Sequence, residues 1–332
     1  MRILLAQPRG FCAGVDRAVD VVELCLDLFG PPVYVRHAIV HNAHVVKSLE
    51  AKGVTFVEEL RDIPEGSLTV FSAHGVSPEV RKEAADRKLR VIDATCPLVT
   101  RVHLEVLRYS REGYRIILIG HRGHVEMAGT MGEAPDAVTL VSSPDDIAKL
   151  PVYDGKVIYL SQTTLSIEDT ADMIDALKEK FPQLEAPPKT DICYATTNRQ
   201  AAVKDLAKHA DVIFVLGSAT SSNSNRLVET ARRAGARSVL VEDLDHFDVS
   251  FLKDVKTVGI TAGASTPLTF VDAFIGLLKT HGADSVESCM TIDERVWFAL
   301  PSDIQKEAEA KRPDHPLLKK HAIGTSSSMN VR

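Results

Sequence analysis

The segment RGFCAGVDRAVDVV (residues 9–22) places a cysteine in a glycine-flanked turn at the predicted start of an amphipathic helix. Gly10 and Gly14 interrupt an apolar run, and the apolar residues after Gly14 recur at the spacing of one helix face. A thiol at a helix N-terminus lies beside unpaired backbone amides, which favour the thiolate that binds metals or acts as a nucleophile. Taken alone, Cys12 is also compatible with a small buried side chain of no chemical role.

Two further segments repeat this pattern. RVIDATCPLVTRVHLEVL (residues 90–107) and KTDICYATTNRQAAVKDL (residues 189–206) each predict a strand, a cysteine and a helix in that order. Cys12, Cys96 and Cys193 therefore share one local context and are separated by intervals of domain size. Self-similarity at such a spacing indicates a repeated structural unit.

The segments between the cysteines predict the fold class. Apolar stretches such as RIILIG (residues 115–120) and DVIFVLG (residues 211–217) end in polar turns that are followed by predicted helices. Continuous rather than alternating apolar strands are typical of parallel sheets covered by helices on both faces. We therefore predict an α/β protein of three related lobes around a pseudo-threefold axis, each with a small, mainly parallel sheet.

The predicted lobes divide the 332 residues among them. Lobe 1 spans residues 14–96, lobe 2 spans residues 97–193, and lobe 3 combines residues 194–283 with residues 1–13. Residues 284–332 are predicted to form a C-terminal extension. Its polar tail beyond Pro301 is expected to be mobile.

Polar residues follow the predicted strands at matching places in the three lobes. After the first strand of each lobe come His41, His124 and the turn Ser221, Ser222 and Asn223. After the last strand come His74, Thr163 with Thr164, and Ser265. Ligands of open α/β sheets bind beyond the carboxyl ends of the strands, so we expect these residues and the cysteines to line one central cavity. The alternative is that they are isolated histidines and a solvated serine-rich loop.

Three thiolates from three lobes suit a 4Fe-4S cluster in which one iron lacks a cysteine ligand. Such an iron has an open coordination position and acts as a Lewis acid as well as an electron relay. Zinc bound by three cysteines and one histidine is the alternative, and ligand softness does not exclude it. However, the sequence has no CxxC pair, the close spacing that most structural zinc sites use.

The imidazoles, hydroxyls and amide of the polar rings are typical of an anion site, to which helix N-termini add backbone N–H donors. Phosphate or diphosphate is the predicted ligand. No GxxxxGK[ST] motif and no GxGxxG motif after a strand is present, which disfavours nucleotides. Glu126 follows His124 by two residues and is placed to deliver protons, although an exposed glutamate at a helix start is the alternative.

Composition and charge limit the remaining function classes. The chain has 39 Lys and Arg against 45 Asp and Glu, a net charge of −6, which argues against a nucleic-acid partner. The N-terminus resembles neither a signal nor a transit peptide, and no apolar run is long enough for a membrane span. We therefore expect a cytoplasmic protein without a membrane partner, whose five cysteines form no structural disulfides.

Several motifs together resemble the LytB/IspH family of 4-hydroxy-3-methylbut-2-enyl diphosphate reductases over about residues 1–298. They are PRGFCAGVDRA, VHN, SAHGVSP, DATCPLV, GHRGHVE, SQTTLS, DICYATTNRQ, GSATSSNSNRL and TAGASTP. The resemblance implies a trefoil of three α/β domains around one oxygen-sensitive 4Fe-4S cluster per chain. It also implies the last step of the methylerythritol phosphate route to isoprenoids, in which an allylic hydroxyl is removed to give isopentenyl and dimethylallyl diphosphates.

The resemblance assigns roles to residues at matching motif positions. It implies cluster ligation by Cys12, Cys96 and Cys193. It implies diphosphate binding by His41, His74, His124, Ser221, Ser222, Asn223 and Ser265. Glu126 matches the proton donor, and Thr163, with Thr164 beside it, matches the threonine near the substrate hydroxyl. A low-potential electron donor of ferredoxin or flavodoxin type is implied as a partner.

Two rival functions remain open at the level of sequence. A redox-neutral cluster dehydratase would turn over without a reductant. A non-catalytic sensor of a phosphorylated metabolite would need no cluster, and its affinity would survive replacement of the cysteines.

Overall fold

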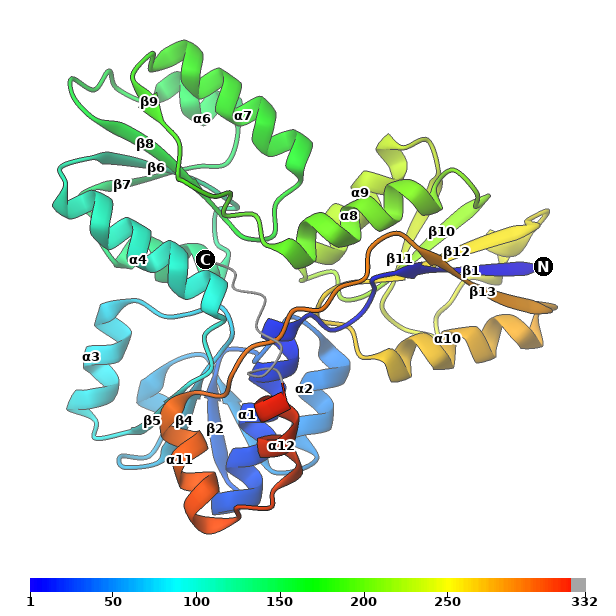
Figure 1. Ribbon diagram of the computed structural model, residues 1–332, viewed down its shortest axis with the longest axis horizontal. Coiled ribbons are helices and arrows are strands. Elements are labelled where there is room, and N and C mark those ends of the chain that lie inside the picture. Colours follow the sequence, from blue (N-terminus) through cyan, green and yellow to red (C-terminus); the bar gives the residue numbers. More distant parts are fainter. Residues whose placement is uncertain (324–332) are drawn as a thin grey trace.

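Three lobes, each built on its own parallel sheet, surround the centre of the molecule in the computed structural model, which describes residues 1–323 (Figure 1). Every strand pairing in the three sheets is parallel. The predicted α/β fold of three lobes is therefore confirmed. Within residues 1–323, no helix combines the length and the apolar character that crossing a membrane requires.

The first lobe has a four-stranded sheet of order β3-β2-β4-β5. Its strands are β2 (Val33–Arg36), β3 (Val54–Val57), β4 (Leu68–Phe71) and β5 (Arg90–Asp93). The helices of this lobe are α1 (Ala13–Phe29), α2 (Ala43–Glu50), the single turn η1 (Leu60–Asp62) and α3 (Pro78–Asp86). Apolar side chains of α1 and α2 pack on one face of the sheet, and those of η1 and α3 pack on the other.

The second lobe repeats this plan with the sheet order β7-β6-β8-β9. Its strands are β6 (Arg115–Ile119), β7 (Val138–Val141), β8 (Val157–Ser161) and β9 (Leu184–Glu185). Its helices are α4 (Pro97–Arg111), α5 (Val125–Gly132), α6 (Pro144–Lys149) and α7 (Ile167–Lys180). Helices α4 and α5 cover one face, and α6 and α7 cover the other.

The third lobe has a five-stranded sheet of order β11-β10-β12-β1-β13. Its strands are β1 (Arg2–Gln7), β10 (Val212–Leu216), β11 (Arg237–Val241), β12 (Thr257–Ala262) and β13 (Ser285–Met290). Its helices are α8 (Tyr194–Leu206), α9 (Ser222–Arg233), the turn η2 (Val249–Leu252) and α10 (Leu268–Thr280). Helix α10 covers one face and α8 with α9 the other, so this sheet too is buried on both sides. The N-terminal strand lies in this last lobe, as Figure 1 shows.

The C-terminal region differs from the expected mobile tail over residues 302–323. After β13 joins the sheet of lobe 3, the chain crosses to lobe 1 and forms α11 (Ser302–Lys311) and α12 (Pro316–Ile323) against α1 (Figure 1). Ile304 is fully buried in the core of lobe 1, and Nε2 of His321 donates a 2.7 Å hydrogen bond to the carboxylate of Asp20. Apolar side chains on one face of this mainly polar segment thus pack the two helices against lobe 1. Residues 324–332, for which mobility was also expected, lie outside the described residues.

Candidate active site

One cavity at the meeting point of the lobes is lined by every residue that the sequence analysis singled out. These are Cys12, Cys96, Cys193, His41, His74, His124, Glu126, Thr163, Thr164, Ser221, Ser222, Asn223 and Ser265. Helices from all three lobes begin at its wall, because the strand ends and helix starts of each lobe face the centre. The predicted convergence therefore exists in space.

The three cysteines occupy the same structural position in each repeat. Cys12, Cys96 and Cys193 are the N-cap residues of α1, α4 and α8, and none of their side chains caps its helix by a hydrogen bond. Their backbone N–H groups donate to the carbonyls of Ala264, Ala73 and Thr163, at 3.1, 3.0 and 3.0 Å respectively. Each thiol is therefore fixed at a helix start while its sulfur stays available to a ligand.

These backbone hydrogen bonds also define equivalent positions after the last strands. The residues that follow the three acceptors are Ser265, His74 and Thr164. Thr164 is therefore the counterpart of His74 and Ser265 in the second lobe. Thr163 is the equivalent of Ala73 and Ala264 in the other two lobes. Its side-chain hydroxyl, which alanine lacks, is available for a different contact.

The sulfurs of Cys12 and Cys96 lie on either side of Gly14, and all three cysteine thiols are desolvated. A Cβ atom at Gly14 would lie 2.7 Å from Sγ of Cys96 and 3.9 Å from Sγ of Cys12, so only glycine fits between them. Burial, followed by the charge of Cys12, raises the pKa of Cys96 to about 12 and that of Cys193 to about 11. Because neighbouring thiolates repel each other, ionising all three needs positive charge between them, as a metal centre provides.

Three histidine rings form the opposite wall of the cavity. The ring centroid of His41 lies 4.2 Å from that of His74 and 5.1 Å from that of His124. Burial, together with the charges of His41 and His121, lowers the pKa of His124 to about 4. Burial is also the largest cause of the lowered pKa values of His74 and His41. Nε2 of His41 is buried without a hydrogen-bond partner. The lowered pKa values favour neutral imidazoles, and a bound anion would supply an acceptor for Nε2 of His41.

Polar groups at the start of α9 also line the cavity. Ser221 is the N-cap of α9, and Oγ of Ser222 lies 3.0 Å from Oγ1 of Thr164. Asn223 accepts a 2.9 Å hydrogen bond from the backbone N–H of Ala264. Hydroxyls and amides held by such contacts, beside the positive end of a helix, are the groups that bind phosphates.

Glu126 is buried rather than exposed, which excludes the alternative of an ordinary solvated glutamate. Its side chain is 3% exposed, and Thr163 donates to it from its backbone N–H and its hydroxyl, at 2.8 and 3.0 Å. Burial raises the pKa of Glu126, and the two hydrogen bonds from Thr163 oppose that rise. A carboxyl group in this setting retains a proton at higher pH than one in water.

Comparison with known proteins agrees with this geometry. The family model described as LytB protein matches residues 3–279. The chain belongs to the LytB family. It is 53% identical over 312 residues to a 4-hydroxy-3-methylbut-2-enyl diphosphate reductase of Streptomyces avermitilis, covering 93% of this chain and 92% of the relative. It is 52% identical over 309 residues to the reductase of the same name from Haemophilus influenzae, covering 92% of this chain and 98% of the relative.

Two solved structures of LytB-family reductases have the same fold. The E-1-hydroxy-2-methyl-but-2-enyl-4-diphosphate reductase of Plasmodium falciparum matches with a TM-score of 0.91 and 41% identity, over 93% of this chain and 98% of its own. A second structure, titled as the terminal enzyme of the non-mevalonate pathway, matches with a TM-score of 0.62 and 31% identity, over 84% of this chain and 100% of its own.

Sequence reasoning missed a second layer of residues behind the cysteines of this LytB chain. Arg17 donates to the carbonyls of Ala94 and Thr95, next to Cys96, at 3.2 and 3.1 Å. Arg199 donates to the carbonyls next to Cys12 and is fully buried. The only sequence signal for Arg17 and Arg199 was a positive charge among the small and apolar residues of a predicted helix. Their acceptors lie in distant segments, so the contacts themselves were not predictable.

Proposed function

We propose that this chain is a 4-hydroxy-3-methylbut-2-enyl diphosphate reductase, which removes the allylic hydroxyl of its substrate to yield isopentenyl and dimethylallyl diphosphates. The observation that carries the proposal is one cavity lined by three helix-capping cysteines, three neutral histidines and a buried glutamate. Relatives support the proposal, because the chain is more than 50% identical to enzymes named 4-hydroxy-3-methylbut-2-enyl diphosphate reductase over more than nine-tenths of their length.

The proposed cofactor is one 4Fe-4S cluster bound by Cys12, Cys96 and Cys193. All five cysteines are free, and Gly14 leaves open the space between two of the three sulfurs. No group of three His, Cys, Asp or Glu side chains within residues 1–323 is close enough to bind a single metal ion. The three cysteines come from separate segments and form no CxxC pair, so a multi-iron group suits this set better than the zinc alternative, whose structural sites use closely spaced pairs. When bound, the cluster supplies electrons singly and has one iron with an open position.

The histidines and the start of α9 are proposed to bind the diphosphate. The orphaned Nε2 of His41 gains an acceptor, and Ser221, Ser222, Asn223 and Ser265 add neutral donors. A bound diphosphate brings negative charge beside imidazoles whose pKa values burial had lowered. It therefore raises those pKa values and strengthens each hydrogen bond by making the donor charged.

Glu126 is proposed to give a proton to the departing hydroxyl oxygen. The overall change consumes two electrons and two protons: the carbon–oxygen bond breaks, the oxygen leaves as water, and a carbon–hydrogen bond forms at either end of the allyl unit. Glu126 supplies the first proton because burial raises its pKa, so the carboxyl group keeps a proton at higher pH than a solvated glutamate does. Thr163 orients the carboxyl group and restabilises it after the proton has left.

The reaction needs an external source of two electrons. We propose a low-potential partner of ferredoxin or flavodoxin type, which delivers them one at a time. We also propose a cytoplasmic location, because a chain with five free cysteines suits a reducing compartment.

Anaerobic purification followed by iron and sulfide analysis and a turnover assay tests the proposal. We expect about four irons and four sulfides per chain and product formation only with a reductant. Turnover without reductant would favour the cluster dehydratase. The non-catalytic sensor would be favoured if the wild-type protein contains no iron and Cys96→Ser binds the substrate with unchanged affinity.

A further inference from the structure

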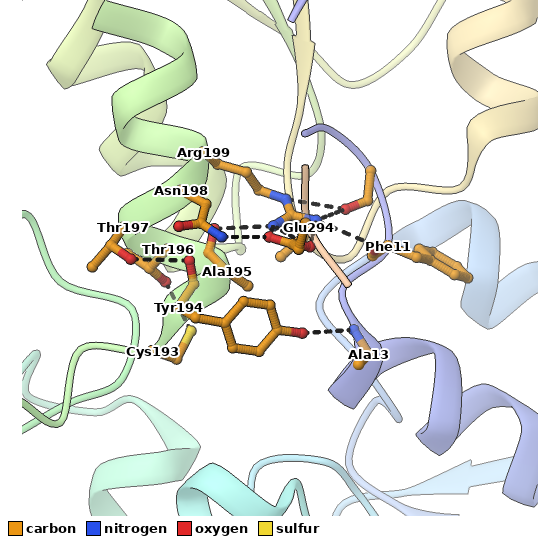
Figure 2. A network of polar contacts seen from close by, with 12 residues as sticks. Phe11, Ala13, Cys193, Tyr194, Ala195, Thr196, Thr197, Asn198, Arg199 and Glu294 are labelled. Carbon is orange, nitrogen blue, oxygen red and sulfur yellow. Dashed lines mark hydrogen bonds and ion pairs between the residues drawn. The ribbon is translucent and has the colours of Figure 1, made fainter. Parts of the chain in front are cut away.

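Arg199 is a completely buried arginine that contacts the segment before Cys12 (Figure 2). It projects from α8, the helix that Cys193 caps, toward the turn before Cys12. Its guanidinium group donates at 2.7 and 3.2 Å to the carbonyl of Gly10 and at 3.3 Å to that of Phe11. One side chain therefore links the helix start that presents Cys193 to the turn that presents Cys12.

Glu294, from the segment after β13, neutralises this arginine. Its carboxylate lies 3.2 Å from Nη1 of Arg199 and accepts a 3.0 Å hydrogen bond from Nδ2 of Asn198. Figure 2 shows the three side chains together between the Cys12 turn and α8. The C-terminal segment thus contributes one of the two charges of a buried pair next to the cysteines.

Mechanical positioning alone does not account for a charged pair at this place. Burying two ions costs several kcal/mol, and apolar side chains of equal volume hold buried segments together as well or better. Nearby, Tyr194 accepts a 3.1 Å hydrogen bond from the backbone N–H of Ala13 and ties the same two segments without any charge. The pair therefore adds something that a neutral contact lacks, namely an electric field at the Cys12 turn.

The two charges act unequally on the cavity. The arginine donates hydrogen bonds to carbonyls on the turn itself, whereas the carboxylate accepts from the arginine and from Asn198. The turn consequently experiences a net positive field whose size depends on both residues.

We propose that Arg199 and Glu294 are positioning residues that fix the Cys12 turn and, through their unequal charges, set the reduction potential of the bound cluster. This inference rests on the cluster of the proposed function. Reduction adds negative charge to the cluster, so Arg199 favours the reduced form and Glu294 opposes it.

Redox titration of the purified, cluster-loaded protein, followed by electron paramagnetic resonance, tests the pair. At the wild-type midpoint potential, we expect Arg199→Met to lower the ratio of reduced to oxidised cluster by about tenfold, which corresponds to about 59 mV for one electron. Glu294→Gln, which keeps the side-chain shape, is expected to raise the same ratio. Shifts of opposite sign are not produced by a general loosening of the fold.

Two further variants separate charge from hydrogen bonding. Arg199→Lys keeps the charge but not the forked donors, so we expect a potential near the wild-type value and faster loss of iron to a chelator. Glu307→Gln removes a matched carboxylate that pairs with Arg90 on lobe 1, and we expect no change of potential. If Arg199→Met does not retain a cluster, the upward shift in Glu294→Gln still decides the question.

Equal potentials in wild type and Glu294→Gln, or shifts of the same sign in both charge-removing variants, would overturn the proposal. Failure of the proposed function is distinguishable, because it shows as absence of iron and sulfide in the wild type before any titration begins.

Discussion

Thr163 donates a hydrogen bond to each oxygen of the Glu126 carboxyl group. The backbone N–H reaches Oε1 at 2.8 Å and the hydroxyl reaches Oε2 at 3.0 Å, across an interval of 37 residues. The second lobe has Thr163 where the equivalent positions of the other two lobes have alanine, and this difference supplies the hydroxyl of the contact. The buried acid of the cavity is therefore fixed in orientation and protected against an extreme rise of its pKa.

Replacement of the acid is the first test of its proposed role. Glu126→Gln preserves the shape and still accepts a hydrogen bond from Thr163, but it has no proton to give at neutral pH. We expect turnover to fall by about 10² to 10⁴, the usual contribution of general acid catalysis. Iron content and substrate affinity should stay near wild type in the same preparation. A variant that reduces substrate at the wild-type rate would assign the proton to Thr163 with a water chain instead.

The pH profile tests the hydrogen bond between the two residues. Because activity requires protonated Glu126, the rate should fall as the pH rises through the raised pKa of this group. Thr163→Val removes the hydroxyl that stabilises the carboxylate, so the pKa rises further and the falling limb should move to higher pH by about one unit. Thr163→Ser restores the hydroxyl and should restore the profile. A limb that moves to lower pH would contradict the assignment.

The three N-cap cysteines and the two remaining cysteines should behave differently. Serine in place of Cys12, Cys96 or Cys193 is expected to abolish cluster binding. Cys25 is buried in the core of lobe 1 and Cys289 lies on β13, so their serine variants should retain iron. Iron and sulfide counts after anaerobic purification give the comparison. Loss of iron in Cys25→Ser equal to that in Cys96→Ser would show that the set of three is wrong.

The histidines should affect substrate binding without affecting iron. A hydrogen bond to a charged group contributes about 1.5 to 3 kcal/mol, so replacing His41 or His124 by alanine should weaken binding by about tenfold to over a hundredfold. Calorimetric titration with the diphosphate substrate under anaerobic conditions measures this change. Replacement of His37, which pairs with Glu58 outside the cavity, is the matched control. Iron loss in His124→Ala would support the alternative hypothesis that this residue is a metal ligand.

The docked C-terminal helices make a prediction about stability. Ile304 is fully buried between α11 and lobe 1, so Ile304→Ala should lower the free energy of unfolding by about 2 to 5 kcal/mol. Glu309 lies on the exposed side of the same helix, and Glu309→Ala should change stability by about 0.5 kcal/mol or less. Urea denaturation of both variants gives the two values. Equal stability of Ile304→Ala and wild type would show that the helices do not stay docked.

The sequence by itself determined the local structure of the site. Each cysteine is the N-cap of its helix, and Cys12 and Cys96 follow the strands β1 and β5, whereas residues 189–192 before Cys193 do not form the strand that the sequence predicts. His124 and Glu126 share one turn, since one caps α5 and the other lies in its first turn. Repetition of these units predicted three parallel lobes, because continuous apolar strands are stable only when helices cover both faces.

Only the tertiary structure decided which groups meet. The contact of Thr163 with Glu126, the buried pair of Arg199 and Glu294, and the docking of Ile304 on lobe 1 join residues that are distant in sequence. No local pattern encodes such partners, because a buried charge or hydroxyl is recognised by the donors and acceptors that packing brings to it. The same packing excludes water from the centre, and that desolvation is what raises the pKa of Glu126 and lowers those of the histidines.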